Sequence, residues 1–417
     1  MKISEIKPEV YVLAERAMKR LYPVFDKIDD VAMQNTKKVM EAFQENKVSE
    51  SCFAGTTGYG YDDLGREILD KIYAQIFGAE AALVRINFVN GTHALTAAMF
   101  ATVKPGDVIL SVTGTPYDTL RNAIGISGNC HGSLKFYGID YAEVALADNG
   151  EPDYEKIEKS ASDKRVAAVM IQRSRGYEDR KAPSISEIGK ICDIVHKVNP
   201  NANIMVDNCY GEFTDVVEPT QVGADIIAGS LIKNPGGGIA PTGGYIAGKA
   251  ELVERAAMRL TTPGIGGECG STLGNNRLLF QGMFVAPHTV AQALKTAAFC
   301  AAMMDELGIE SSPAFDAERS DIIQMVKLGS PEKMKKFCLG IQSGAPVDSF
   351  VTPEPWPMPG YDCPVIMAAG SFIQGSSIEL SADGPIREPY TVYVQGGLTF
   401  ESGKLGIMMA VNAMLEK

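Results

Sequence analysis

Residues 202–238 read ANIMVDNCYGEFTDVVEPTQVGADIIAGSLIKNPGGG, and this stretch decides the fold class of the chain. It contains two short apolar runs, 202–207 and 224–228, separated by a polar connection. The first run ends on Asp207, and the second is followed by Lys233 and a glycine-rich turn. Short, continuous apolar runs bounded by turn residues are typical of strands that are buried on both faces of a parallel sheet. The stretch therefore predicts two buried strands with polar side chains after them.

Helical and strand-like segments alternate on both sides of this stretch. Helical spacing of apolar residues is found at 63–77, 92–103 and 184–198, and apolar runs typical of strands at 107–112, 165–172 and 243–248. Strands that alternate with helices imply a mainly parallel sheet that is covered on both faces. We therefore predict an α/β fold.

The length of 417 residues is too great for one simple core, so we expect more than one domain. A helical stretch near 286–307 is followed by segments rich in Pro and Gly, such as ADGPIREPY at 382–390. The later segments 365–373 and 390–396 have the pattern of strands. We predict an N-terminal helical segment (1–60), a large α/β domain (61–290) and a smaller α+β domain (291–417).

Composition excludes several classes of partner. The formal net charge of −12 disfavours nucleic acid and anionic lipid surfaces. The N-terminal segment carries charges at helical spacing and has no signal-peptide core, and no apolar run is long enough to span a bilayer, so we expect a cytoplasmic protein. The eight cysteines form no CxxC pair and the four histidines lack ligand spacing, which predicts neither disulfides nor a metal site.

Polar residues at the carboxyl ends of parallel strands are the candidates for function, because ligands bind at that edge of such sheets. Asp207 ends one predicted strand, Lys233 follows the next, and the turn from Asn90 to His93 opens a helix. A strand-end Asp, a later Lys and a Gly-Thr turn at a helix start are the parts that pyridoxal phosphate requires.

Each of these residues has a defined task in such a site. Lys233 forms a Schiff base with the cofactor, and Asp207 keeps the pyridine nitrogen protonated so that the ring accepts carbanion electrons. The helix start with Thr92, together with Ser230, would hold the phosphate dianion. Taken singly, Asp207 could be a cap residue, the turn before Thr92 an ordinary helix start, and Lys233 a solvated surface lysine. Their ordered combination favours the cofactor site.

Five runs of sequence resemble a known family: GYGYDDLGRE, NGTHALTAA, VDNCYGEF, GSLIKNPGGGIAPTGGYIAG and REPYTVYVQGGLT. They are similar to the bacterial family called aluminium-resistance protein, or methionine gamma-lyase-related and cystathionine beta-lyase-like protein. The resemblance covers about residues 10–415. It implies the aspartate aminotransferase-like fold of fold type I pyridoxal-phosphate enzymes and a small-molecule amino-acid substrate.

The resemblance also implies roles for individual residues. It assigns Lys233 as the Schiff-base lysine, Asp207 as the partner of the pyridine nitrogen, and Gly91, Thr92, His93 and Ser230 as the phosphate cup. Tyr117 resembles the tyrosine that stacks on the cofactor ring and moves protons, with a core aromatic as the alternative.

Tyr59 and Tyr61 resemble a segment that reaches the phosphate of the neighbouring subunit, although no arginine stands between them and Arg66 comes only later. We therefore expect a homodimer or homotetramer. The segment 264–274 is a candidate interface loop, with a flexible surface linker as the alternative.

A substrate carboxylate calls for a bidentate arginine. Arg387 is the first candidate, because fold type I enzymes usually bring this group from the C-terminal domain. Arg173 and Arg175, just after the run 165–172, are the other candidates. Surface ion pairing is an alternative role for each of them.

The reaction predicted from the resemblance is carbon–sulfur lyase chemistry on cystathionine-, cysteine- or methionine-like substrates. Leu231 and Ile232 stand where gamma-lyases have Ser and Thr, and the spacing Ser-x-x-Lys is that of aminotransferases, so an aminotransferase is the alternative. A non-catalytic metal-stress protein is an alternative from another class. A nicotinamide enzyme is disfavoured because the turn 236–238 lacks GxGxxG spacing.

Overall fold

The computed structural model describes residues 1–128, 130–358 and 363–416. Its larger sheet has the order β1-β7-β6-β5-β4-β2-β3. These strands are β1 (Ala81–Arg85), β2 (Val108–Ser111), β3 (Asp140–Glu143), β4 (Val166–Gln172), β5 (Asn203–Asp207), β6 (Ile226–Ser230) and β7 (Gly244–Gly248). Strands β2 to β6 pair in parallel, and β7 runs antiparallel to both of its neighbours. The predicted mainly parallel sheet is confirmed.

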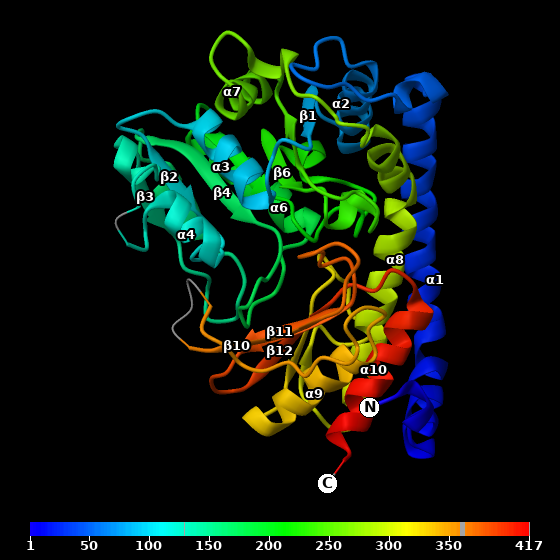
Figure 1. Cartoon of the computed structure of the whole chain (residues 1–417). Coiled ribbons are helices and arrows are strands. Elements are labelled where there is room, and N and C mark those ends of the chain that lie inside the picture. Colours follow the sequence, from blue (N-terminus) through cyan, green and yellow to red (C-terminus); the bar gives the residue numbers. More distant parts are fainter. Residues whose placement is uncertain (129, 359–362, 417) are drawn as a thin grey trace.

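Helices cover both faces of this sheet (Figure 1). They are α2 (Leu64–Phe77), α3 (Gly91–Thr102), α4 (Asp118–Ile124), α5 (Tyr154–Ala161), α6 (Ile185–Val198) and α7 (Ala250–Leu260). Successive residues of a strand point to opposite faces. In β5, Ile204 and Val206 accordingly join the core that contains α2 and α6, whereas Met205 joins the core that contains α3 and α7. Because both faces of the sheet are covered by helices, its strands must be apolar at successive positions.

The smaller sheet is antiparallel, with the order β10-β11-β12-β9-β8. Its strands are β8 (Ser311–Ser312), β9 (Gln324–Lys327), β10 (Val365–Ala369), β11 (Ser381–Pro385) and β12 (Thr391–Gln395). Helices α9 (Pro331–Ser343) and α10 (Phe400–Met414) pack on it. This antiparallel sheet with its helices is an α+β arrangement. Short 3-10 segments lie at Ile3–Glu5, Glu50–Phe53, Lys135–Tyr137, Pro219–Val222, Asn234–Gly236 (η5) and Gly266–Glu268.

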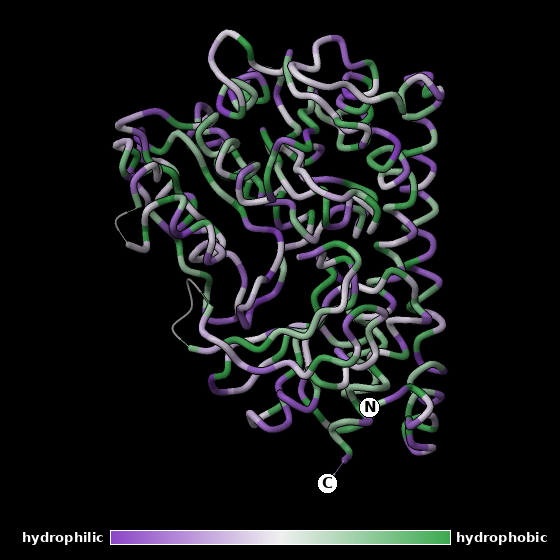
Figure 2. The backbone as a smooth tube through the Cα atoms, viewed as in Figure 1, coloured by the Kyte–Doolittle hydropathy of each residue, from purple (hydrophilic) through white to green (hydrophobic). Residues whose placement is uncertain are grey.

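Two long helices, α1 (Pro8–Glu45) and α8 (Asn276–Glu306), lie side by side along both sheets (Figure 1). Figure 2 shows polar and apolar residues alternating along α1, as expected for an amphipathic helix. Its first half packs into the core of the small domain, and Val39 and Ala42 pack into that of the large domain. The boundary predicted at 290 falls inside α8, which contributes to both cores. No helix of the described residues has the length and hydrophobicity needed to cross a membrane.

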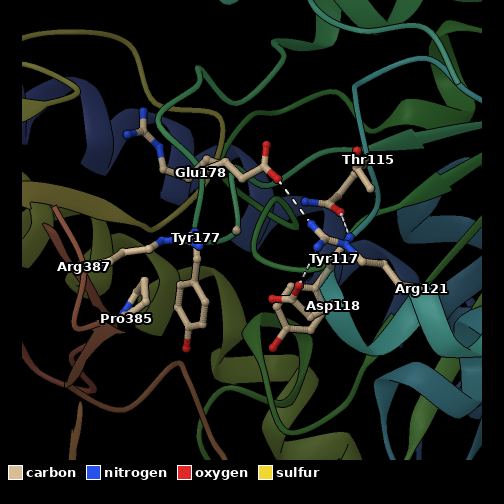
Figure 3. A pocket seen from close by; sticks show the side chains of 11 residues that line it. Thr115, Tyr117, Asp118, Arg121, Tyr177, Glu178, Pro385 and Arg387 are labelled. Atoms are coloured by element: carbon tan, nitrogen blue, oxygen red, sulfur yellow. Dashed lines mark hydrogen bonds and ion pairs between the residues drawn. The ribbon is translucent and has the colours of Figure 1, made fainter. Parts of the chain in front are cut away.

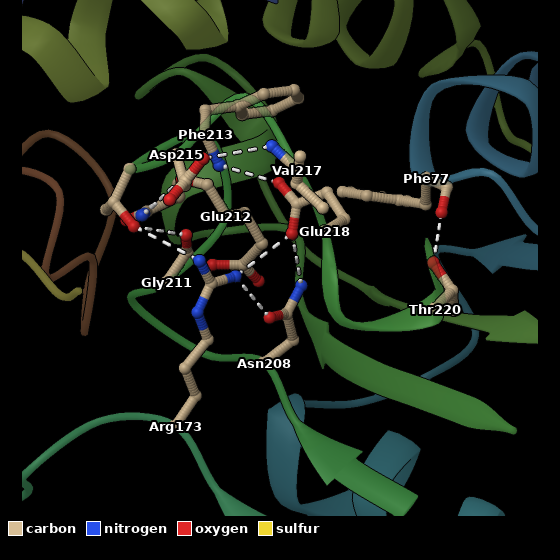
Figure 4. A network of polar contacts seen from close by, with 12 residues as sticks. Phe77, Arg173, Asn208, Gly211, Glu212, Phe213, Asp215, Val217, Glu218 and Thr220 are labelled. Carbon is tan, nitrogen blue, oxygen red and sulfur yellow. Dashed lines mark hydrogen bonds and ion pairs between the residues drawn. The ribbon is translucent and has the colours of Figure 1, made fainter. Parts of the chain in front are cut away.

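A buried polar network holds the loop that follows β5 (Figure 4). Arg173 Nη1 lies 3.0 Å from Glu218 Oε2 and donates to Asn208 Oδ1 at 2.8 Å, and the Arg173 and Glu218 side chains are 0% exposed. Glu212 Oε1 accepts a hydrogen bond from the Tyr245 hydroxyl at 2.8 Å. Burial raises the pKa of Glu212 to about 8, so this carboxyl keeps its proton at neutral pH.

The substitution Glu212→Gln should flatten the dependence of Tm on pH. An unfolded glutamate releases its proton near about pH 4.3, whereas folded Glu212 keeps it up to about pH 8. The stabilising contribution of this group is therefore complete below the unfolded pKa and is lost as the pH rises through the folded pKa. Thermal unfolding at several pH values measures this, with exposed Glu155→Gln as the control. Parallel curves for wild type and Glu212→Gln would contradict the assignment.

Candidate active site

A cavity of about 460 Å³ lies between the two domains. Its large-domain wall includes Asp207 and Lys233, and its small-domain wall includes Met367, Ser381 and Asp383. Small-molecule sites have this size and commonly lie between domains. The carboxyl ends of β5 and β6 open onto the cavity, because both strands run in the same direction.

Asp207 is the last residue of β5 and is 5% exposed. Its Oδ1 accepts a hydrogen bond from the backbone N–H of Cys209 at 3.1 Å. Burial raises the pKa of Asp207, although the charge of Lys233 and the bond from Cys209 act in the opposite direction. A buried carboxylate in this position is stabilised by a cationic ligand group.

Lys233 lies between β6 and the 3-10 segment η5. Its Nζ is 4.0 Å from the centroid of the Tyr210 ring. Burial lowers the pKa of Lys233, but the acidic groups around it, led by Cys209, Tyr210 and Asp207, outweigh burial and raise it above the ordinary value. Burial also raises the pKa values of Cys209 and Tyr210, which are therefore neutral at pH 7, so Asp207 is the neighbour whose charge attracts the lysine.

The glycine-rich turn after Lys233 is required by close packing. A Cβ at position 236 would lie 1.7 Å from the carbonyl oxygen of Leu231, and a Cβ at 238 would lie 2.3 Å from Leu398. Gly238 also has φ +74°, which side chains disfavour. Glycine therefore allows the chain to turn back sharply and fixes where the backbone of Lys233 lies.

The turn at Asn90 forms the start of α3. Asn90 Oδ1 accepts the His93 N–H at 2.9 Å, which leaves the N–H groups of Gly91 and Thr92 in the first turn, where a helix has no internal acceptor for them. Gly91, Thr92 and Ser230 all line the cavity. A Cβ on Gly91 would lie 3.0 Å from Ser230 Cβ, so the helix start and the end of β6 approach each other closely, and both can face one anion.

His93 belongs to this turn but its ring has a different environment. Its Nδ1 accepts the Val89 N–H at 3.3 Å, and the ring packs edge-on against Phe88. Burial, followed by the charge of Arg259, lowers the pKa of His93. His93 is not among the cavity-lining residues, so its contribution is to the turn that presents Gly91 and Thr92.

Tyr117 and Tyr177 stand at the edge of the cavity, with ring centroids 6.4 Å apart (Figure 3). Tyr117 precedes α4, and its backbone N–H donates to Gln172 Oε1 at 2.8 Å. Because Tyr117 is 38% exposed and lines the cavity, it is not a core aromatic. Its position is suited to a stacking or proton-transfer role.

The three candidate arginines differ in burial and in their hydrogen-bond partners. Arg173 is committed to its buried pair with Glu218 and does not line the cavity, so the geometry assigns it to the scaffold. Arg175 is buried, and its guanidinium donates to the Ser312 carbonyl at 3.1 Å and the Ser312 hydroxyl at 3.3 Å. Arg387 is exposed and lines a small pocket of about 70 Å³ that shares Tyr117 and Tyr177 with the cavity (Figure 3).

Tyr59 and Tyr61 lie outside the cavity of their own chain. They are 73% and 55% exposed and stack on each other with centroids 5.6 Å apart. Arg66 is buried and donates to the carbonyls of Gly60 and Gly270, at 2.5 Å and 2.9 Å. It thereby ties the tyrosine segment to the loop 264–274, and it is not exposed to a ligand.

Several cavity residues were not predicted from the sequence. They are Tyr177, Cys209, Tyr210, Ser377, Asp383 and Gln395. The signal for Tyr210 was present, because it stands three residues after Asp207 in VDNCYGEF. Cys209 lies in the same run, and Gln395 ends the predicted strand 390–396, whereas Tyr177, Ser377 and Asp383 lie in segments without a predicted strand end.

The cavity fits a flat, anionic cofactor. A buried carboxylate, a lysine amine and a helix N-terminus next to Ser230 converge on it, and these groups match the nitrogen, aldehyde and phosphate of pyridoxal phosphate. In the part of the chain that the structure describes, no three His, Cys, Asp or Glu side chains cluster as a metal site.

The chain has the fold type I, aspartate aminotransferase-like fold, with its cavity between the two domains. The methionine gamma-lyase family model matches residues 10–415, and the chain belongs to that family. YhfS from Escherichia coli, described as a pyridoxal-5'-phosphate dependent protein, shares the fold at 17% identity, with a TM-score of 0.61 over 90% of this chain and 94% of its own.

Individual relatives agree with this membership. A structure from Clostridium novyi, described as a carbon–sulfur lyase involved in aluminum resistance, is 53% identical, has a TM-score of 0.94, and is matched over 98% of this chain and 96% of its own. The uncharacterized protein YnbB of Bacillus subtilis is 48% identical over 94% of both chains. CalE6, a methionine gamma lyase from Micromonospora echinospora, shares the fold at 17% identity, with a TM-score of 0.55 over 84% of this chain and 89% of its own.

Proposed function

We propose that the chain is a pyridoxal-phosphate-dependent carbon–sulfur lyase that releases a thiol from cystathionine-, cysteine- or methionine-like amino acids. The observation that carries the proposal is the placement of Lys233 and Asp207 after two adjacent parallel strands, facing one cavity with the N-terminus of α3. When bound, pyridoxal phosphate supplies an electron sink for the charge that develops on the substrate α-carbon.

Each of these cavity side chains has its own proposed role in the reaction. Lys233 would hold the cofactor and would remove the proton from the substrate α-carbon. Asp207 would supply a negative charge to the ring nitrogen. The first turn of α3 and Ser230 would hold the phosphate, and Tyr117 would pack against the cofactor and move a proton near the departing sulfur.

Arg387 is our candidate for binding the substrate carboxylate. It comes from the small domain, lies beside Tyr117 and Tyr177, and is exposed. Arg175 lines the same small pocket, but its guanidinium is already engaged with Ser312. An arginine in contact with the carboxylate would fix the substrate through paired hydrogen bonds.

We further propose a homodimer or homotetramer in which Tyr59 and Tyr61 reach the phosphate of the partner subunit. Their exposure, and their position away from the cavity of their own chain, support this arrangement. Arg66 supports it indirectly, because it keeps the tyrosine segment in a defined position. Active sites built across symmetric interfaces are completed only in the assembly.

The ultraviolet–visible spectrum of the purified protein, recorded after reconstitution with pyridoxal phosphate, tests the proposal. We expect an absorption band of lysine-bound cofactor and, with cystathionine, cysteine, methionine or homoserine derivatives, release of a keto acid together with a thiol. In the same assay Arg387→Ala should raise KM more than it lowers kcat.

Two other outcomes would redirect the assignment. A keto acid without thiol, which appears only with a second keto-acid substrate, would identify an aminotransferase. The aminotransferase is kept as the alternative because Leu231 is buried and Ile232 lines the cavity, so neither position offers the hydroxyl found in gamma-lyases. Failure to bind pyridoxal phosphate at all would contradict the whole proposal.

A further inference from the structure

The small-domain wall of the cavity carries an acidic group that the proposed reaction does not use. Among the described residues that line the cavity, the charged ones are Lys233, Asp207 and Asp383. Lys233 and Asp207 have proposed roles at the cofactor, whereas Asp383 belongs to β11 of the small domain. No arginine lines this cavity in the described part of the chain. The wall is therefore suited to a hydrogen-bond donor and not to an anion.

Asp383 has one carboxylate oxygen available for a ligand. The side chain is 4% exposed, its Oδ2 accepts a hydrogen bond from Gln395 Nε2 at 3.3 Å, and Tyr177 also hydrogen-bonds the carboxyl. Its Oδ1 is buried and has no hydrogen-bond partner among the described residues. A buried polar atom without a partner is costly, and such atoms commonly mark a ligand position.

The electrostatic state of Asp383 agrees with such a role. Burial raises the pKa of Asp383 to about 7, and hydrogen bonds from Tyr177 and Gln395 oppose that shift. No ion pair of the described residues involves this carboxyl. A cation that enters the cavity would therefore stabilise the ionised form of Asp383 and would be bound by it.

A second orphan oxygen lies on the same wall. Ser376 is 4% exposed, lines the cavity, and its Oγ is buried with no hydrogen-bond partner among the described residues. An ammonium group has three N–H donors and no acceptor. It could donate to the carboxylate of Asp383, and the Ser376 hydroxyl is a further acceptor on the same wall, whereas an alkyl group offers no donor to either oxygen.

Tyr210 separates this wall from the lysine. The Nζ of Lys233 lies over the Tyr210 ring, and the Tyr210 hydroxyl is 2.9 Å from Ser377 Oγ on the small-domain side. The α-amino group of a substrate must react at the Lys233 end. A group that reaches Asp383 therefore belongs to the other end of the substrate.

We propose that Asp383, assisted by Ser376, binds an ammonium group at the distal end of the sulfur substituent, and so selects amino-acid thioethers with a cationic leaving group. This inference rests on the proposed lyase function and specifies its substrate class. It makes Asp383 a specificity-determining residue.

Three S-substituted cysteines of similar length test the proposal on the cofactor-loaded enzyme: S-(2-aminoethyl)-, S-propyl- and S-(2-carboxyethyl)-L-cysteine. Wild type should have a kcat/KM for the aminoethyl compound about 10- to 100-fold above that for the propyl compound, because a charge-assisted hydrogen bond is gained. The carboxyethyl compound should be the poorest substrate, because its charge repels Asp383.

In Asp383→Asn the preference for the aminoethyl compound should disappear, while kcat/KM for the propyl compound changes less than about threefold. Ser381→Ala is the matched control: it alters the same strand and face but keeps the carboxylate, so the preference should persist. If Asp383→Asn does not fold, Ser376→Ala provides the test and should weaken the aminoethyl preference alone.

The outcomes separate this inference from the lyase proposal. No discrimination by wild type, or an equal loss for all three compounds in Asp383→Asn, would overturn the role of Asp383. No thiol from any compound would refute the lyase function instead. In that case the dissociation constants of the three compounds, measured from the change in cofactor absorbance on binding, still show whether Asp383 selects the ammonium group.

Discussion

Lys233→Ala should lose the absorption band of lysine-bound cofactor and should release thiol about 10²- to 10⁴-fold more slowly than wild type. The physical reason is that one amine has two tasks, anchoring the cofactor and removing the α-proton. Burial lowers the pKa of this amine, and the charge of the nearby Asp207 acts in the opposite direction. Absorbance spectra and a thiol assay measure the two losses separately.

The matched control for Lys233 is Lys197→Ala. Lys197 is 73% exposed and pairs at the surface with Glu158, so its removal should leave the band and the rate unchanged. If Lys233→Ala kept the band, another lysine would hold the cofactor, and the assignment of the cavity would be wrong. Loss of the rate with a retained fold distinguishes chemistry from unfolding.

Asp207→Asn should lower kcat by about 10²- to 10³-fold while the protein stays folded. The amide has nearly the shape of the carboxylate but lacks the charge that keeps the pyridine nitrogen protonated. Because burial raises the pKa of Asp207, this carboxyl costs stability in the cofactor-free protein once the pH rises above its unfolded value. Cofactor-free Asp207→Asn should therefore have a Tm at pH 7 at least equal to that of wild type.

Thermal unfolding and steady-state kinetics on the same preparations test this pair of effects. Asp193→Asn, which removes an exposed carboxylate from α6, is the control and should change neither. An unchanged kcat in Asp207→Asn would show that the ring nitrogen has a different partner. A lower kcat together with a lower Tm would indicate damage to the fold.

The strands around the site were predictable because their pattern is local. Runs 202–207 and 224–228 became β5 and β6 to within two residues, since a strand buried on both faces must be apolar throughout. Strand β11, with the sequence SADGP, was not predicted. It has polar residues, Gly and Pro, and it exists as a strand through its pairing with β10 and β12.

Some residues of the cavity were also predictable from the sequence, whereas the partners of others were not. Tyr117 was identified by resemblance and does line the cavity, as do Gly91, Thr92 and Ser230. Arg173 and Arg175 follow a predicted strand just as a functional residue would. The sequence could not show that both guanidinium groups are committed to partners, Glu218 and Ser312, that lie far away along the chain.

By itself, the sequence determined the parallel sheet, the placement of Asp207 and Lys233 at one edge of it, and the family. These follow from local hydrophobic patterns and from the common direction of adjacent parallel strands. Only the tertiary structure decided that Tyr210 lies under Lys233, that Arg387 is exposed beside the cavity, and that Asp383 faces it with one oxygen unpaired. The packing of the small domain against the large one creates these contacts, and burial and charge pairing depend on neighbours in space.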